Sequence, residues 1–197
     1  MRIIGGEYRS RLIAMPKGVD IRPTQDRVRE AIFNMLGDVS DKTVLDLFAG
    51  SGASGMEAIS RGAARAVFVD NNARCAETIK ANLESLGIDE YRYDIIRANA
   101  LSVFPRLDKD EERFDLVFVD PPYYKDIARK SLINIDSYDI LTQIGIVVVE
   151  HFKKDSLLAP LQTLFQEKER LYGDTAITIF RRIPDDKSKN SNISGDV

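Results

Sequence analysis

The chain has 197 residues, of which 44% are hydrophobic and 30% are charged. This composition suits one globular domain with an ordinary core and leaves room for a small appendage. A single cysteine, Cys75, excludes an internal disulfide and is typical of a reducing compartment. No apolar run approaches the roughly 18 residues of a membrane span. Met1 leads directly into strand-like sequence without a signal peptide, so we expect a cytoplasmic protein.

The charge is unevenly distributed along the chain. The formal net charge of −3 at pH 7 argues against wholesale non-specific binding of nucleic acid. Residues 1–29, however, carry seven Arg or Lys side chains and three acidic ones, a net charge of +4. The remainder is therefore near −7. A basic end on an acidic body predicts a local anion-binding surface.

The first 21 residues are predicted to form a basic arm. Residues 2–15 alternate weakly around Gly5 and Gly6, which is typical of a small β-hairpin or an extended segment. An exposed strand with solubilising charges explains this stretch equally well. After a connector, a helix is expected from Thr24, a possible N-cap, to a stop at Gly37.

Strand-like and helix-like segments alternate across residues 22–183, which we expect to form the main domain. Strands are predicted over 42–48, 65–70, 93–98, 114–119, 144–150, 169–172 and 175–181, and helices over 54–61, 73–86, 102–107, 127–135 and 156–166. This alternation indicates an α/β fold with a doubly wound, mostly parallel sheet. The turn Gly173-Asp174 adds antiparallel strands at one edge. Residues 184–197 are polar and predict a disordered tail.

A glycine-rich loop follows the first predicted strand of the main domain. Gly50, Gly52 and Gly55 match the pattern G-x-G-x-x-G, in which glycines allow a tight turn and close approach of a ligand. Asp70 stands eighteen residues after Gly52, at the end of the next strand. An acid there holds ribose hydroxyls in nucleotide-binding α/β folds. The pattern predicts a ligand with an adenosine-like part; the alternative is a tight turn with an unrelated surface Asp.

Asp46, four residues before Gly50, indicates which ligand. A carboxylate is unfavourable beside a pyrophosphate but suits an ammonium or a sulfonium group, so we favour S-adenosylmethionine over NAD. A third contact region is expected at Asn99 and Ala100, where an amide could hydrogen-bond the adenine edge. Capping of a loop by Asn99 is the alternative.

Asp120, Pro121, Pro122 and Tyr123 end an apolar strand and carry the predicted chemistry. The prolines have fixed φ angles and no N–H, so the strand tip offers a carboxylate, bare carbonyl oxygens and an aromatic ring. Such acceptors can take both N–H bonds of a planar exocyclic amine and free its lone pair, while Tyr123 stacks on the base. A simple turn is the alternative.

These motifs, taken together, resemble those of the bacterial 16S rRNA guanine-N2 methyltransferases (RsmD type), which are class I S-adenosylmethionine-dependent enzymes with a Rossmann-like fold. The resemblance covers roughly residues 1–182. Its most specific parts are Arg2-Ile3-Ile4-Gly5-Gly6, Arg22-Pro23-Thr24, Asp26-Arg27-Val28-Arg29-Glu30, the segment 46–52, Asp120-Pro121-Pro122-Tyr123 and Tyr172-Gly173-Asp174-Thr175.

The resemblance implies a seven-stranded sheet whose last strand is inserted antiparallel. It implies methyl transfer from S-adenosylmethionine to N2 of one guanine in 16S rRNA, within an assembled or assembling small subunit. The positions matching the family's cofactor site are Asp46, Phe48, Ala49, Gly50, Gly52, Asp70, Asn71, Asn99 and Ala100. Asn99 departs from the family, since members often carry Asp there. The resemblance implies that residues 120–123 hold the target base.

Basic and polar residues near the N-terminus are candidates for RNA contacts, mainly with phosphates. They are Arg2, Arg9, Arg11, Arg22, Thr24, Arg27 and Arg29. No His/Cys/Asp cluster suggests a metal, and the single histidine, His151, is expected to be structural. Nothing demands more than a monomer. Other functions stay open: another RNA or DNA amino methyltransferase (adenine N6), an NAD-dependent oxidoreductase, or a non-catalytic rRNA-binding assembly protein.

Overall fold

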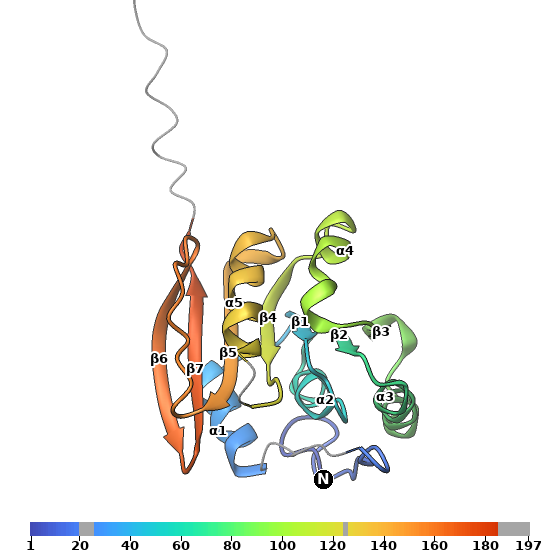
Figure 1. The fold of residues 1–197 in the computed structure, drawn as a ribbon. Helices are drawn as coiled ribbons and strands as arrows, with labels where there is room; N and C mark the ends of the chain where they lie inside the picture. Colours follow the sequence, from blue (N-terminus) through green and yellow to red (C-terminus); the bar gives the residue numbers. More distant parts are fainter. Residues whose placement is uncertain (20–25, 124–125, 185–197) are drawn as a thin grey trace, which may run out of the picture.

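A computed structural model describes residues 1–19, 26–123 and 126–184. Two predicted RNA-contact residues, Arg22 and Thr24, and the predicted tail from residue 185 onward lie outside this range. The described part of the chain forms a seven-stranded sheet with helices on both faces (Figure 1). No helix within the described ranges combines the length and the apolar character that crossing a membrane requires.

The strands follow the order β3-β2-β1-β4-β5-β7-β6 across the sheet. Their bounds are β1 Thr43–Asp46, β2 Arg65–Asp70, β3 Tyr93–Arg97, β4 Phe114–Val119, β5 Leu141–Phe152, β6 Leu164–Tyr172 and β7 Thr175–Arg182. The first five strands pair in parallel, whereas β7 is inserted between β5 and β6 and is antiparallel to both. The predicted α/β fold, with a mostly parallel sheet and an antiparallel last strand, is confirmed.

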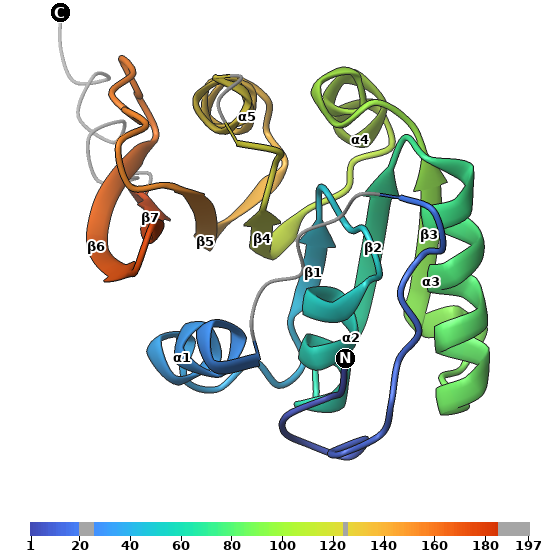
Figure 2. The same cartoon turned by 60° about the horizontal axis from the view of Figure 1, so that its bottom comes forward.

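Helices cover the two faces in two groups (Figure 2). The helices are α1 Asp26–Leu36, α2 Ala53–Ser60, α3 Ala73–Leu86, α4 Phe104–Lys109 and α5 Ile127–Ser137, with short 3-10 turns η1 Glu90–Arg92 and η2 Ala100–Ser102. Helices α1, α2 and α3 pack on one face, and α4 and α5 on the other. Successive strand residues point to opposite faces, as in Phe118 and Val119, which belong to different cores. Both faces are therefore apolar, as a buried parallel sheet requires.

Local signals correctly placed the end of α1 and both ends of α3. Gly37 adopts φ 73° directly after α1, as expected of the residue that stops it. Asn72 caps α3 by accepting the Arg74 N–H at 2.9 Å, and Gly87 ends that helix at φ 73°. The α3 bounds are those predicted from the sequence.

The helix predicted over 156–166 is wrong. Its first part is irregular, and from Leu164 the chain belongs to β6. The Asp136 carboxylate at the end of α5 accepts the N–H groups of Gln162 and Thr163, each at 2.7 Å. These bonds hold the segment extended before β6, and pairing with β7 then outweighs its local helical pattern.

The N-terminal arm is not a regular hairpin. One antiparallel bridge, Arg2 to Leu12, is the extent of its strand pairing within the described residues. The arm instead packs on α2, where the buried Glu57 carboxylate accepts the N–H groups of Ile4 and Gly5, each at 2.8 Å. Ile3 and Ile13 bury their side chains in the core beneath α1–α3, so the arm is part of the packed domain.

Candidate active site

Four acidic side chains stand at the carboxyl edge of the sheet. They are Asp46 of β1, Asp70 of β2, Asp120 after β4 and Glu150 of β5. In each case the residue two positions earlier belongs to the core beneath α1–α3: Val44, Phe68, Phe118 and Val148. Because side chains alternate along a strand, all four acids lie on that same face. The sheet thus gathers acids that are far apart in sequence.

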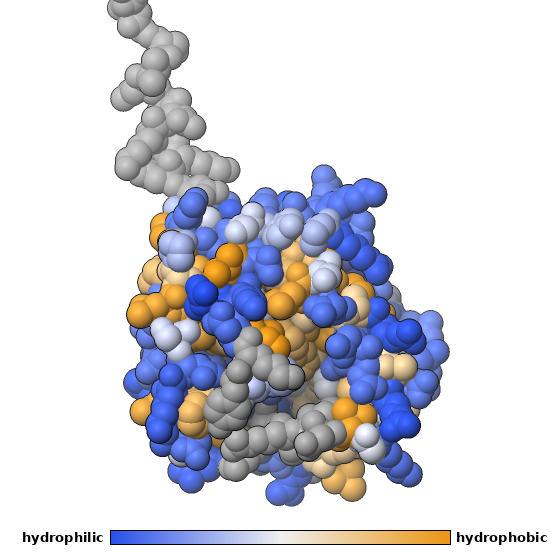
Figure 3. Space-filling model, viewed as in Figure 1, coloured by the Kyte–Doolittle hydropathy of each residue, from blue (hydrophilic) through white to orange (hydrophobic). Residues whose placement is uncertain are grey.

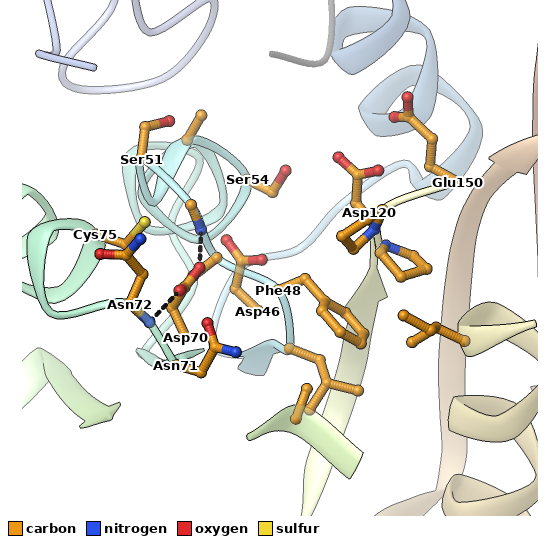
Figure 4. A pocket seen from close by; sticks show the side chains of 18 of the residues that line it. Asp46, Phe48, Ser51, Ser54, Asp70, Asn71, Asn72, Cys75, Asp120 and Glu150 are labelled. Atoms are coloured by element: carbon orange, nitrogen blue, oxygen red, sulfur yellow. Dashed lines mark hydrogen bonds between the residues drawn. The ribbon is translucent and has the colours of Figure 1, made fainter. Parts of the chain in front are cut away.

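A pocket of about 730 Å³ opens at this edge (Figure 4). Its lining includes all four acids and most of the residues predicted for the cofactor and the target base, namely Asp46, Phe48, Ala49, Gly50, Asp70, Asn71, Asn99, Ala100, Asp120, Pro121, Pro122 and Tyr123. No Lys or Arg belongs to the described lining. The face seen in Figure 3 is hollowed near its centre, where hydrophobic residues show between hydrophilic ones. The pocket therefore favours cations and neutral hydrogen-bond donors over phosphates.

The glycines of the loop divide into two roles. Gly50, at φ 54°, lines the pocket. Gly52, at φ 81°, does not: a Cβ there would stand 2.8 Å from the Met56 Cε, so it permits the close turn into α2. A Cβ at Gly55 would stand 2.3 Å from the Phe68 ring, so this glycine permits close packing of helix on strand. The predicted contact of Gly52 with the cofactor stays a prediction.

Asp70 holds the loop against the end of β2. Its Oδ2 accepts the Gly50 N–H at 2.9 Å, and its Oδ1 accepts the Asn72 N–H at 2.8 Å (Figure 4). A carboxylate has about four lone-pair positions. These two bonds therefore leave capacity to accept hydroxyl groups of a ligand.

Asp46 is buried at the floor of the pocket, with 4% of its surface exposed. Its Oδ2 accepts the Gly55 N–H at 3.0 Å, at the start of α2. Burial raises the pKa of Asp46 to about 7, the Gly55 N–H opposes this rise, and the nearby negative charge of Asp70 adds to it. A cation bound beside Asp46 would lower this pKa and favour the ionised carboxylate.

Asn99 acts as a loop cap, which was one of the two roles predicted for it. Its Oδ1 accepts the Leu101 N–H at 2.8 Å and so begins η2. Asn99, Ala100 and Leu101 all line the pocket. With Oδ1 engaged, the amide NH₂ is the group best suited to contact a bound ligand.

Residues 120–123 form the other end of the pocket. Pro121 is buried, and Asp120 is half-buried beside it. The Tyr123 hydroxyl lies 2.8 Å from Thr175 Oγ1 and 3.4 Å from Glu150 Oε1, and its ring centroid lies 6.2 Å from that of Phe152. The segment Tyr172–Thr175, singled out in the sequence, thus contacts the Tyr123 side chain across the sheet.

The predicted RNA-contact residues separate into exposed and buried ones. Arg2, Arg9, Arg11 and Arg27 are exposed. Arg29 is only 1% exposed, so its assignment to RNA is wrong. Its guanidinium donates to the Arg2 carbonyl at 2.6 Å and to Asp26 at 3.0 Å, and its Nε lies 3.7 Å from Glu57. Arg29 ties α1 to the arm and to α2.

Several pocket residues were not predicted from the sequence. They are Met1, Val19, Leu47, Ser51, Ala53, Ser54, Asn72, Cys75, Leu101, Ile127 and Glu150. Glu150 could have been found, since an acid directly after an apolar strand is the pattern that identified Asp120. Met1 could not, because its place depends on how the arm packs.

Two single residues behave as structural groups. Cys75 is buried, and burial together with the charge of Asp70 raises the pKa of its thiol to about 11. His151 is buried between the Phe152 carbonyl, 3.0 Å from Nδ1, and Thr178 Oγ1, 2.9 Å from Nε2. Burial lowers the pKa of His151. Within the described residues no three His, Cys, Asp or Glu side chains group as metal ligands would.

Known proteins match this chain over nearly all of its length. A family model described as conserved hypothetical protein 95 matches residues 1–181. YlbH of Bacillus subtilis, a candidate rRNA methyltransferase, is 36% identical over 183 residues, which are 92% of this chain and 99% of that protein. Ribosomal RNA small subunit methyltransferase D of Escherichia coli is 32% identical over 92% of this chain and 90% of that protein.

Solved structures share the architecture. The methyltransferase candidate yhhF of Escherichia coli matches with a TM-score of 0.79 and 30% identity, covering 93% of this chain and 98% of that chain. The more distant SMU.776, a methyltransferase candidate solved with SAH, matches with a TM-score of 0.65 at 19% identity, over 82% of this chain and 50% of that chain. The second likeness concerns the fold alone. Since the family model spans residues 1–181 and the resemblance found in the motifs is confirmed, the chain belongs to the conserved hypothetical protein 95 family, the small subunit methyltransferase D type.

Proposed function

We propose that this protein transfers a methyl group from S-adenosylmethionine to the exocyclic N2 of one guanine in 16S rRNA. One observation carries the proposal: the glycine loop and the 120–123 strand tip line the same pocket. A donor held by the loop and an amine held by the tip would therefore meet. The printed name of the Escherichia coli relative supports rRNA of the small subunit as the substrate.

The donor fits the acidic part of the pocket. The Asp46 carboxylate faces the cavity and would accept from the ammonium of the methionine part (Figure 4). Asp70 would accept the ribose hydroxyls, and the Asn99 amide and Ala100 would border adenine. A pyrophosphate would meet acids and no described cation in this lining, which argues against NAD.

Methyl transfer is an in-line displacement. The target guanine leaves its stack to enter the pocket, as base-modifying enzymes require. The Asp120 carboxylate and the Pro121 carbonyl accept the two N2 hydrogens and turn the nitrogen lone pair toward the methyl carbon, while Tyr123 stacks on the base. The C–N bond forms as the C–S bond breaks, and sulfur keeps the electron pair and becomes neutral. The nitrogen then loses one hydrogen as a proton to Asp120, which passes it to solvent.

The RNA would be held by the exposed basic arm. Arg9 and Arg11 lie on the arm, and the Arg11 guanidinium donates to the Ser85 carbonyl of α3 at 2.8 Å. Arg2 and Arg27 are also exposed. These side chains would contact phosphates, which position an RNA without selecting its sequence. A folded small subunit, assembled or assembling, would supply the selection, and one copy of the chain suffices.

The experiment removes the Asp120 carboxylate. Small subunits from a strain lacking the enzyme are incubated with tritiated S-adenosylmethionine, and the product nucleotide is identified by mass spectrometry. We expect Asp120→Ala to lower kcat by about 10²–10³-fold, the usual effect of removing one preorganised group. Its affinity for S-adenosylhomocysteine, measured by calorimetry, should be unchanged.

The matched control is Asp89→Ala, an exposed acid directly before η1 and outside the pocket lining, which should keep full activity. Thermal shifts with S-adenosylhomocysteine and with NADH separate the two cofactors. Stabilisation by NADH alone, or full activity of Asp120→Ala, would refute the proposal.

A further inference from the structure

Glu150 is the pocket acid to which the proposed reaction gives no role. It follows Val149 on β5, and Val149 is in register with Val119 on the parallel neighbour β4. Glu150 is the next residue of β5 and Asp120 is the first residue after β4, so both follow directly from a pair of neighbouring strands, which lie about 4.8 Å apart. Their side chains lie on the same face, and Figure 4 shows both carboxylates at one end of the pocket.

The surroundings of Glu150 orient its carboxylate. The side chain is half-buried, and its Oε1 lies 3.4 Å from the Tyr123 hydroxyl. That hydroxyl also lies 2.8 Å from Thr175 Oγ1 on β7. The acid is therefore held between β4 and β7, next to the place where a base would enter. A carboxylate accepts several hydrogen bonds at once, so its contact with Tyr123 does not prevent another.

The chemistry of guanine calls for a third acceptor at this end of the pocket. The edge of guanine that carries N2 presents three N–H donors: two on N2 and one on the adjacent N1. Asp120 and the Pro121 carbonyl take the two N2 hydrogens in the proposed reaction. The N1–H would otherwise be buried without a hydrogen-bond partner, which is unfavourable.

We propose that the Glu150 carboxylate accepts the guanine N1–H and thereby selects guanine. This inference rests on the proposed function. In adenine and cytosine the ring nitrogen beside the exocyclic amine is an acceptor, and a carboxylate facing it would meet another lone pair. Both groups would then be buried without a donor, and a site built to hydrogen-bond one substrate group rejects analogues that lack it.

A base analogue tests this contact. 2-Aminopurine keeps the N2 amine of guanine, but its N1 is an acceptor. Small subunits are reconstituted from 16S rRNA carrying guanine or 2-aminopurine at the mapped target, and kcat/KM is measured for each. For the unaltered protein we expect kcat/KM to be about 100-fold lower on 2-aminopurine, the scale of losing a buried hydrogen bond to a charged group. Similar values on the two bases would overturn the inference.

The variant Glu150→Gln gives the sharper result. Its amide oxygen can still accept from Tyr123, while its NH₂ can donate to N1 of 2-aminopurine. We expect the guanine preference to fall by at least about tenfold, because the amide can serve either base. An unchanged preference would overturn the inference, even if total activity falls.

Two further variants distinguish a direct contact of Glu150 with the base from an effect that Glu150 has through Tyr123. Tyr123→Phe removes the hydroxyl that contacts Glu150, and it should keep the guanine preference whatever its effect on kcat. Loss of the preference in Tyr123→Phe to the same degree as in Glu150→Gln would mean that Glu150 acts through Tyr123, and would overturn the contact with N1–H. Glu77→Gln, on the exposed side of α3, is the matched control and should behave as the unaltered protein.

The proposed function can fail independently of this contact. If the unaltered protein methylates the target base in neither substrate, both the proposed function and the contact between Glu150 and N1–H are refuted. If it methylates guanine N2 and the base preference ignores Glu150, only the inference about Glu150 is refuted.

Discussion

Asp46 combines burial with a charge that the proposed cofactor would need. Burial raises the pKa of Asp46 to about 7, so the protonated form is populated near neutral pH. An arriving ammonium requires the ionised form. Binding below pH 7 must therefore expel a proton, and the affinity becomes linked to pH.

The first prediction follows from this linkage. Between pH 5 and 7 the affinity for S-adenosylhomocysteine should rise by up to about tenfold per pH unit, since Asp46 must lose one proton on binding. Asp46→Asn should bind more weakly and lose most of this pH dependence. Calorimetric titrations across that range measure both. If the affinity of the variant and that of the unaltered protein changed equally with pH, the proton released on binding would come from another group.

The same residue predicts an opposite effect on stability. The raised pKa means that the folded chain prefers protonated Asp46, so this contribution to stability is complete below the ordinary pKa of 3.8 and is lost as pH rises through about 7. Asp46→Asn keeps an oxygen for the Gly55 N–H but carries no charge. Without ligand, the Tm of Asp46→Asn minus the Tm of the unaltered protein should be larger at pH 8 than at pH 4. Equal differences in Tm at both pH values would show that folding does not raise the pKa of Asp46.

At the scale of elements, Glu57 joins three segments. This side chain has no exposed surface, accepts the N–H groups of Ile4 and Gly5, and pairs with Arg61 at 2.7 Å. Arg29 of α1 lies 3.7 Å from it. The arm, α1 and α2 therefore depend on one buried carboxylate, and Met1 reaches the pocket wall through this packing.

Glu57→Gln should accordingly be severe. Its NH₂ would face the backbone N–H groups of the arm, and two arginines would lose a buried counter-charge. We expect the free energy of unfolding in urea to fall by about 3–5 kcal/mol, the usual effect of breaking a buried ion pair. Glu77→Gln should change it by less than about 0.5 kcal/mol, as surface substitutions do. A loss below 1 kcal/mol for Glu57→Gln would show that the arm does not depend on this group.

The segment 156–166, for which a helix was wrongly predicted, also shows that contacts between elements decide local structure. Residues 156–166 have apolar spacing that favours a helix, yet Asp136 binds the backbone of Gln162 and Thr163, and β7 pairs with the strand that follows. Asp136 is 26 residues from Gln162 in sequence, and the β7 partners of Leu164 and Gln166 lie beyond the β6–β7 turn. These tertiary contacts outweighed a local preference of a few tenths of a kcal/mol per residue.

Across the whole molecule, charge is segregated between the arm and the pocket. The pocket lining described here is acidic, whereas the arm exposes Arg9 and Arg11. In Figure 2 the arm lies over α2 and α3, on the side of the sheet opposite α4. An RNA reaching the pocket would cross the basic arm, which offsets the repulsion from the acidic body.

Replacing Arg9 and Arg11 by Glu should weaken binding to small subunits without changing the affinity for S-adenosylhomocysteine. The slope of log K against log salt should decrease by about 1–2, as expected for losing two phosphate contacts. Filter binding at several salt concentrations measures it. Arg106→Glu with Lys109→Glu on α4 makes the same change in net charge on the other side of the sheet, and should leave the slope unchanged. If both pairs lower the slope equally, the arm has no specific part in binding.

Local rules were enough to predict most elements, the glycine turn and the strand tip at Asp120, since turns, caps and strand ends depend on neighbouring residues. Tertiary structure alone decided three other features: that Arg29 is buried, that Glu150 stands beside Asp120, and that four acids share one pocket. The last two depend on which strands become neighbours and in what register, and these pairings join residues 20 or more positions apart. The burial of Arg29 depends on how the arm and α2 pack against α1. No local pattern encodes either kind of contact.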